Sequence, residues 1–214
     1  MMTAAEIEMH FTAPDGGYAF ARWGRPIVPV VFGVADETLT VIKGAIEAVV
    51  TLAGHNMAET DAELGANLMF FFFKDWQELL DVPKLGEMIP NLDALVLKLQ
   101  LADASQYRSF RFDDAGGIQA CFVFLRMKGK LAQMPAETLA LGQSVQAILR
   151  WSDAAFSKCS PLAVLPEKQI VVLRPEIGAV IRAAYEASMP VCAVDKSHAL
   201  RIFARIQACE NKKV

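Results

Sequence analysis

The chain has 214 residues, of which 54% are hydrophobic and 21% are charged, and its formal net charge is −3 at pH 7. A chain of this length can bury a core without disulfides or metal ions, and its apolar fraction excludes an intrinsically disordered protein. The slightly acidic balance creates no positive field that would attract a phosphate backbone, so nucleic acid is not expected as a partner.

Two short strands are predicted over residues 18–23 and 27–32, after a polar start that ends in two glycines. Pro26 and Pro29 cannot donate to a strand ladder, so the second strand is expected at a sheet edge or with an irregular beginning. Residues 1–17 could form a flexible N-terminus.

A helix is predicted next, because apolar residues recur along one stripe at helical spacing. Asp36 is expected to cap its N-terminus, and Gly54 is expected to end it. The stripe consists of Leu39, Ile42, Ile46, Val49, Val50 and Ala53.

Residues 67–73 include four consecutive phenylalanines and are apolar on both faces, which predicts a central strand covered on both sides. Residues 76–101 have a helical pattern interrupted by Pro83 and Pro90, so two or three short helices are expected there. Residues 106–112 and 118–127 flank a glycine-containing loop and are predicted to form a hairpin.

A further helix is predicted to begin at Pro135, and its apolar face is expected to continue through Ser152 toward Phe156. Two more helices are expected over residues 175–187 and 195–208. Mixed strands and helices followed by a helical C-terminal half predict a single α+β domain over residues 1–214, with a small mixed or antiparallel sheet.

The cysteines are widely spaced and include no CxxC pair, so they are expected to be reduced thiols of a cytoplasmic protein. Residues 1–12 lack the basic and apolar regions of a secretory signal. The longest uncharged apolar run, residues 64–73, is half of the roughly 20 residues that a membrane-spanning helix needs. No transmembrane segment is expected. The cysteines are Cys121, Cys159, Cys192 and Cys209, and Cys121 is expected in the core.

Catalytic motifs are scarce. The chain has three histidines, His10, His55 and His198, and no two have the spacing that would place them on one helix face for zinc. No serine lies in a GxSxG elbow, and no glycine motif is of the phosphate-binding type. Acidic groups such as Asp61 with Glu63 lie in polar connections, where a raised pKa for acid or base catalysis is not expected. We therefore expect no cofactor and no metal, and we favour a protein that is not an enzyme.

Two of the histidines have structural interpretations. His55 follows the helix-ending Gly54 and is expected to bond the free carbonyls of the helix end. His198 lies on the last helix, whose Lys196, Arg201 and Arg205 predict a solvated basic face that could also contact anionic lipid. The other face of this helix is expected to pack Leu200, Phe203 and Ile206 on the core.

A row of polar residues in the helix from Pro135 is the best candidate for a site. Gln143, Gln146, Arg150 and Asp153 follow one another at helical separations of three, four and three residues. Such a row could line a cleft in which Arg150 binds a carboxylate or phosphate and the glutamines form hydrogen bonds. The alternative is an exposed flank of an amphipathic helix.

Several short motifs are distributed over the chain from about residue 18 to residue 208. They are Arg22-Trp23 with Pro26-Ile27, Leu52-Ala53-Gly54-His55, Ala66-Asn67, Gln146-Ala147-Ile148 with Asp153, and Ile181-Arg182-Ala183-Ala184-Tyr185 with Met189-Pro190. Together these motifs resemble an uncharacterised bacterial family, domain of unknown function 2927, whose members often look like secreted lipoproteins with a zincin-like fold.

The resemblance implies a zincin-like fold in which residues 142–153 take the place of the active-site helix of a zinc peptidase. A zincin needs His-Glu-x-x-His there, because two imidazoles hold zinc and the glutamate activates water. This chain has Gln143-Ser144-Val145 instead, without an imidazole or a carboxylate. Zinc hydrolysis is not expected unless ligands come from elsewhere, such as His55 and Asp153.

The leading hypothesis is a non-catalytic binding or interaction protein on a degenerate zincin-like domain, with a small molecule, peptide or protein as its partner. A cleft of this kind can hold an extended peptide through main-chain pairing along an edge strand. One rival is an enzyme, such as a hydrolase, that uses His55 with Gln143, Arg150 or Asp153 in one pocket. Another is a peripheral membrane protein that attaches through the basic C-terminal helix. The high apolar fraction also makes a homodimer plausible.

Overall fold

A mixed four-stranded sheet organises the chain, whose computed structural model describes residues 2–168 and 170–211. The strand order is β2-β3-β5-β4, with β2 at Pro29–Phe32, β3 at Leu68–Phe73, β5 at Ile118–Arg126 and β4 at Gln106–Phe112. β2, β3 and β5 are parallel to one another, and β4 runs antiparallel to β5. β2 begins at Pro29 and lies at an edge, as its prolines predict, while the phenylalanine-rich β3 is central.

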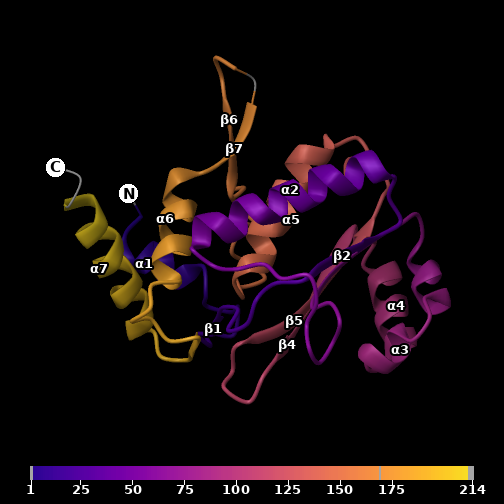
Figure 1. The fold of residues 1–214 in the computed structure, drawn as a ribbon, viewed down its shortest axis with the longest axis horizontal. Coiled ribbons are helices and arrows are strands. Elements are labelled where there is room, and N and C mark those ends of the chain that lie inside the picture. The colour runs from indigo at the N-terminus through magenta and orange to yellow at the C-terminus, as the bar shows by residue number, and fades with distance from the viewer. Residues whose placement is uncertain (1, 169, 212–214) are drawn as a thin grey trace.

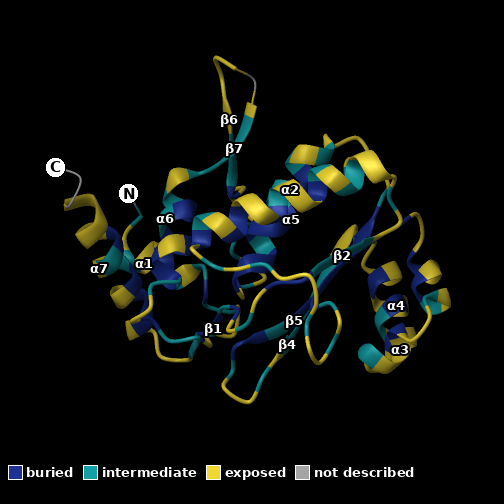
Figure 2. Cartoon of the chain, in the orientation of Figure 1, coloured by how far each residue is buried: buried dark blue, intermediate teal, exposed yellow. Residues whose placement is uncertain are grey.

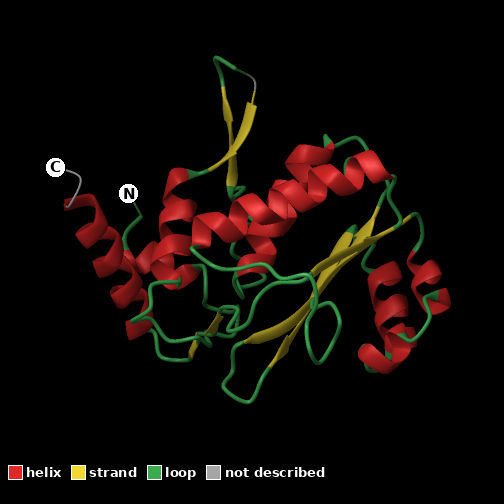
Figure 3. Cartoon of the chain, in the orientation of Figure 1, coloured by secondary structure: helices red, strands yellow, loops and turns green. Residues whose placement is uncertain are grey.

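Helices cover both faces of this sheet (Figure 1). On one face, Leu68 and Phe70 of β3 pack in a core with α2 (Asp36–Ala53) and α5 (Ala136–Ile148). On the other face, Met69, Phe71 and Phe73 pack against three short elements, η1 (Trp76–Asp81), α3 (Leu85–Met88) and α4 (Leu92–Leu101). Figure 3 shows the sheet between these layers. The α+β class and the short helices are therefore confirmed.

The first and last helices of the chain lie together beside this sheet. α1 (Ala4–Met9) contacts α7 (Ser197–Asn211), and α6 (Pro175–Ala184) packs between α7 and α2. The short strands β1 (Phe20–Ala21) and β8 (Cys192–Ala193) pair antiparallel and join the two ends of the chain. Ile7 and Phe11 are buried, so the segment considered as a flexible N-terminus contributes to the core.

An antiparallel hairpin, β6 (Leu162–Leu165) with β7 (Ile170–Leu173), projects from the body of the molecule (Figure 1). The sequence analysis expected only helices after residue 135 and missed this hairpin. Its outer part exposes Val164, Leu165 and Ile170. Figure 2 shows exposed residues on this hairpin and along the outer face of α2. None of the helices in the described ranges is long and apolar enough to cross a membrane.

Two helix boundaries differ from the predicted ones. α2 ends at Gly54, in the left-handed conformation that the sequence predicts, but its N-cap is Ala35 and not Asp36. α5 begins after Pro135 and ends at Ile148, so the helical face does not continue to Phe156 as expected. The helix stops because Leu149 is extended and bridges to Arg22, and the N–H of Arg150 donates to the carbonyl of Ala21 at 2.9 Å.

The turn after β2 contains a glycine that the fold requires. Gly33 has φ +84°, and a Cβ at this position would lie 2.1 Å from the backbone oxygen of Phe72. We predict that Gly33→Ala lowers the free energy of unfolding by about 2 kcal/mol or more, because it combines a left-handed backbone with a steric clash. Urea denaturation monitored by circular dichroism measures the change.

Gly44→Ala is the matched control, since Gly44 lies on an exposed turn of α2 and a Cβ there would meet no atom within 4 Å. This substitution should raise the free energy of unfolding by about 0.5–1 kcal/mol. Equal effects of the two substitutions would contradict the assignment of Gly33.

Candidate functional site

A cleft runs beside β4 and is bordered on its other side by the segment that follows α5. Its volume is about 800 Å³. Residues from the strand, from the last turn of α5 and from the irregular segment after it form the walls. They are Gln106, Tyr107, Arg108, Ser109, Phe110, Phe112, Gln146, Arg150, Trp151, Ser152, Asp153, Phe156, Ser157, Lys158, Cys159, Ser160 and Pro161.

Strand alternation determines which β4 side chains face α5. Gln106, Arg108 and Phe110 pair with Leu125, Val123 and Cys121 of β5, which lie on the face covered by α2 and α5. Side chains on one face of a sheet alternate along each strand, so these three β4 residues share that face. Arg111 belongs to the opposite face, where its guanidinium carbon lies 5.5 Å from the centre of the Phe122 ring.

The outer edge of β4 is open. The N–H of Arg126 donates to the carbonyl of Ser105 at 2.9 Å, so these two residues form a hydrogen-bonded pair. Because such pairs alternate in an antiparallel ladder, the backbone N–H and C=O groups of Gln106, Arg108 and Phe110 point away from β5. In the part of the chain that the structure describes, β5 is the only strand that pairs with β4.

Arg108 is the central charged group of the cleft. It donates to the side-chain oxygen of Gln143 at 2.6 Å and to that of Gln146 at 3.3 Å. Its Nε is buried and has no hydrogen-bond partner among the described residues. Burial lowers the pKa of the Arg108 guanidinium from its usual value, although nearby Cys121 and Asp153 act to raise it. An arginine stays charged even so, which leaves a positive charge held mainly by neutral amides.

Aromatic side chains from the segment that follows α5 line part of the cleft. Trp151 donates its ring N–H to the carbonyl of Val145 at 2.8 Å, stacks on Phe11 at 5.1 Å between ring centres, and meets Phe156 edge-on at the same distance. His10 lies behind this group, 5.3 Å from Phe156, and burial lowers its pKa. The segment after the helix is therefore held in place by ring contacts where regular structure is absent.

The structure brings together four of the five residues proposed from the sequence. Gln146, Arg150 and Asp153 line the cleft, and Gln143 contacts Arg108. Gln143 and Gln146 lie on α5, whereas Arg150 and Asp153 follow its end, so the helical spacing that suggested the row applies only to the first pair. The sequence analysis missed Arg108, although an arginine on the inward face of a predicted strand was a usable signal.

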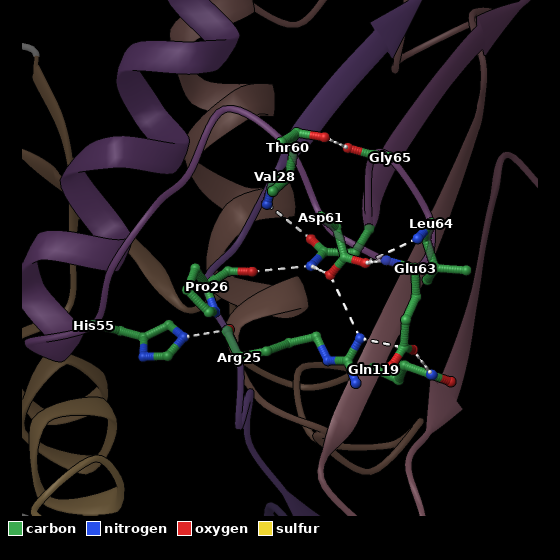
Figure 4. A network of polar contacts seen from close by, with 11 residues as sticks. Arg25, Pro26, Val28, His55, Thr60, Asp61, Glu63, Leu64, Gly65 and Gln119 are labelled. Carbon is green, nitrogen blue, oxygen red and sulfur yellow. Dashed lines mark hydrogen bonds and ion pairs between the residues drawn. The ribbon is translucent and has the colours of Figure 1, made fainter.

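His55 is not among the residues that line the cleft. Its Nε2 lies 2.8 Å from the carbonyl oxygen of Arg25 (Figure 4). Its ring contacts Tyr185 at 5.2 Å between centres. Burial, together with the charge of Arg22, lowers the pKa of His55, although the bond to Arg25 acts to raise it. The imidazole bonds a carbonyl outside α2, and not the helix-end carbonyls that were expected. The enzyme hypothesis combined His55 with Gln143, Arg150 or Asp153 in one pocket, and the residues that line this cleft do not include His55.

Asp61 fixes the loop between α2 and β3 (Figure 4). One carboxylate oxygen accepts the N–H groups of Glu63 and Leu64, both at 2.9 Å, and the other accepts from Asn67 at 3.0 Å and meets Arg25 at 3.5 Å. Burial acts to raise the pKa of Asp61, but these hydrogen bonds and the Arg25 charge lower it below its usual value. This carboxylate has a structural role, in line with its sequence interpretation.

The C-terminal helix agrees with the sequence interpretation in part, because Lys196 and Arg201 are exposed while Phe203 and Ile206 pack on the core. His198 is buried with 2% exposure and shares a hydrogen bond of 2.9 Å with the Tyr18 hydroxyl, whereas Leu200, which was expected on the core, is exposed. Lys196 pairs with Glu8 and Arg205 with Glu186. Arg201 donates to the carbonyl of Ser188. His198, Ile202 and Ile206 are four residues apart, so they share the face of the helix that packs on the core. Leu200 lies two residues from His198 and from Ile202, which places it on the opposite side of the helix.

Metal ligands do not cluster within residues 2–168 and 170–211, where no group of three or more histidine, cysteine or acidic side chains is placed to hold an ion. The four cysteines are free thiols, and Cys121 is fully buried, as predicted. Burial raises the pKa of Cys121 to about 12.

Comparisons with known proteins found no matching family model, no matching curated protein and no matching solved structure. The cleft must therefore be interpreted from its own residues.

The buried His198 should make stability depend on pH. Burial, with the charge of Arg201, lowers its pKa from 6.5 to about 4. The unfolded chain therefore binds this proton at a higher pH than the folded chain does. The contribution of the neutral His198 to the free energy of unfolding is fully present above pH 6.5 and is lost as the pH falls toward about 4. We predict that His198→Gln reduces the change in Tm between neutral pH and about pH 5, measured by thermal denaturation. His10 and His55 should retain part of this pH dependence of Tm. If the change in Tm with pH is the same in His198→Gln as in the unmodified protein, His198 is not its source.

Proposed function

We propose that this protein is a non-catalytic binding module that holds an extended peptide segment as an added strand along β4. The single observation that supports this function is that the cleft lies along the open edge of β4. The outward backbone groups of Gln106, Arg108 and Phe110 offer a ladder of donors and acceptors to an incoming strand. Such strand addition draws affinity from main-chain hydrogen bonds and specificity from pockets for alternate side chains.

The walls of the cleft suit this mode of binding. β4 has seven residues, which is enough to pair with a short segment. Trp151 and Phe156 provide apolar contacts at one end, while Arg108 and Arg150 provide charged donors. An added strand would direct every second side chain toward α5 and the others toward the opposite face.

We also propose that the domain is a degenerate zincin-like one, as its resemblance implies. An antiparallel edge strand beside a helix that carries Gln143 and Gln146 supports this view. The two side chains that α5 offers near the cleft are amides, which hydrogen-bond to Arg108. Their neutral oxygens suit orientation of a guanidinium better than retention of a catalytic zinc ion.

A cytoplasmic location is part of the same proposal, because the four cysteines are free thiols and two of them, Cys159 and Cys209, are exposed. A homodimer stays a prediction from composition. The apolar side chains of the β6–β7 hairpin, Val164, Leu165 and Ile170, are the exposed group that supports it.

Removing one main-chain donor tests the strand-addition proposal. Seven-residue peptides are selected from a random displayed library on the immobilised protein, and their Kd values are measured by fluorescence anisotropy. Gln106→Pro deletes an outward N–H at the first position of β4, where proline is tolerated. Gln106→Ala is the matched control, because it removes the same side chain and keeps the N–H. We expect Gln106→Pro to bind the peptides roughly 3- to 10-fold more weakly than Gln106→Ala, because the loss of one main-chain hydrogen bond changes the binding free energy by about this amount.

Two outcomes contradict the proposal. One is that selection yields no peptide that binds the folded protein. The other is that the two variants bind the selected peptides equally, which would place the peptides away from the β4 edge.

A further inference from the structure

Arg108 forms no ion pair within the described residues, although the charge of nearby Asp153 acts on its guanidinium. The ion pairs there join other arginines and lysines to carboxylates, and neither Arg108 nor Arg150 takes part in one. A buried charge is costly to hold unless an opposite charge and hydrogen bonds compensate for the lost hydration. Arg108 donates hydrogen bonds to two neutral amide oxygens, but its buried Nε has no acceptor among the described residues.

The amides around Arg108 are themselves oriented. Gln143 donates its side-chain N–H to the oxygen of Gln106 at 2.7 Å, and Gln146 donates to the carbonyl of Gly142 at 3.2 Å. Because the NH₂ group of each amide is engaged, each oxygen is directed to the guanidinium. Gln143 is 4% exposed, so this arrangement is built into the protein interior. It fixes the guanidinium in place before a ligand arrives, which lowers the entropic cost of binding.

A second cation stands at the same cleft. The guanidinium carbon of Arg150 lies 5.1 Å from the centre of the Phe112 ring, a contact that positions the group and leaves its hydrogen-bond donors available. Lys158 adds a third positive charge, and Asp153 is the one carboxylate among the lining residues. The cleft is therefore positive in a chain whose net charge is −3.

We propose that the segment that binds along β4 carries a carboxylate, and that Arg108 and Arg150 receive it. This inference rests on the proposed function. A carboxylate matches the planar donor fork of arginine in charge and geometry, and it supplies the direct ion-pair partner that Arg108 lacks among the described residues. Asp153 reduces the excess positive charge, which favours a singly charged group. In a strand paired with β4, side chains that point toward α5 lie on the same face as Arg108.

Matched peptides test the inference and identify the source of the carboxylate. Three seven-residue peptides share one sequence, taken from the library selection, and differ only at one side chain that points toward α5 and at the C-terminus. The first peptide has glutamate at the varied position and an amidated C-terminus. The second has glutamine at that position and an amidated C-terminus, and the third has glutamine and a free C-terminal carboxylate. We expect the glutamate peptide or the free-carboxylate peptide to bind at least about tenfold more tightly than the neutral peptide. The preferred peptide shows whether a side chain or the chain end is recognised.

Variants assign the preference to its residues. Arg108→Gln and Arg150→Gln should each bring the ratio of the Kd of the neutral peptide to the Kd of the preferred carboxylate peptide closer to one. Arg108→Lys should keep only part of this preference, because lysine keeps the charge but lacks the planar donor fork of arginine. Arg111→Gln is the matched control, since Arg111 lies on the same strand and faces away from the cleft. It should leave the ratio unchanged. Circular dichroism verifies that each variant is folded, and Arg150→Gln still tests the inference if Arg108→Gln does not fold.

The outcomes separate the two proposals. If the charged and neutral peptides bind equally well and Gln106→Pro still weakens both, the carboxylate inference fails and strand addition stands. If the preference survives in Arg108→Gln and Arg150→Gln, other cations recognise the carboxylate and the inference fails. If no peptide binds, both proposals fail together.

Discussion

Burial of β3 and β5 on both faces is the constraint on which the rest of the structure depends. Phe70, Val123 and their neighbours pack under α2 and α5, while Phe71 and Phe122 pack against η1, α3 and α4. Two parallel strands with both faces covered leave little freedom of register, because a shift by one residue would exchange the two cores. The flanking strands then become edges. β2 begins at a proline, and β4 is left with an unpaired side that borders the cleft.

The cleft arises where regular structure stops. α5 ends at Ile148 because Leu149 pairs with Arg22, and the chain then continues without a named helix or strand until β6. Ring contacts of Trp151 hold the segment that follows α5. Arg108 of β4 donates hydrogen bonds to Gln143 and Gln146 of α5. A polar wall and an aromatic wall are thus brought together by the end of one helix and the edge of one strand.

Much of the fold could be predicted from the sequence where apolar periodicity is strong. The stripe from Ile42 to Ala53, the left-handed Gly54 and the phenylalanines of β3 specify their elements locally, and the structure confirms them. The end of α5 was missed because no glycine or proline marks residue 149 and the helix is stopped by a backbone pairing between Leu149 and Arg22. The β6–β7 hairpin was missed as well. The same limit applies to the site. Local spacing could suggest Gln143 and Gln146, but Arg108 joins them only after β4 and α5 have packed.

The positions of the three tryptophans have a practical consequence for spectroscopy. Trp23 and Trp76 are fully buried, and each donates its ring N–H to a backbone carbonyl inside the protein. Trp151 is the remaining one, and it lines the cleft with 8% exposure. An occupant of the cleft would change the polarity around that indole and leave the other two in their present surroundings. The protein therefore carries an intrinsic optical reporter, whose emission can follow occupancy without an attached dye.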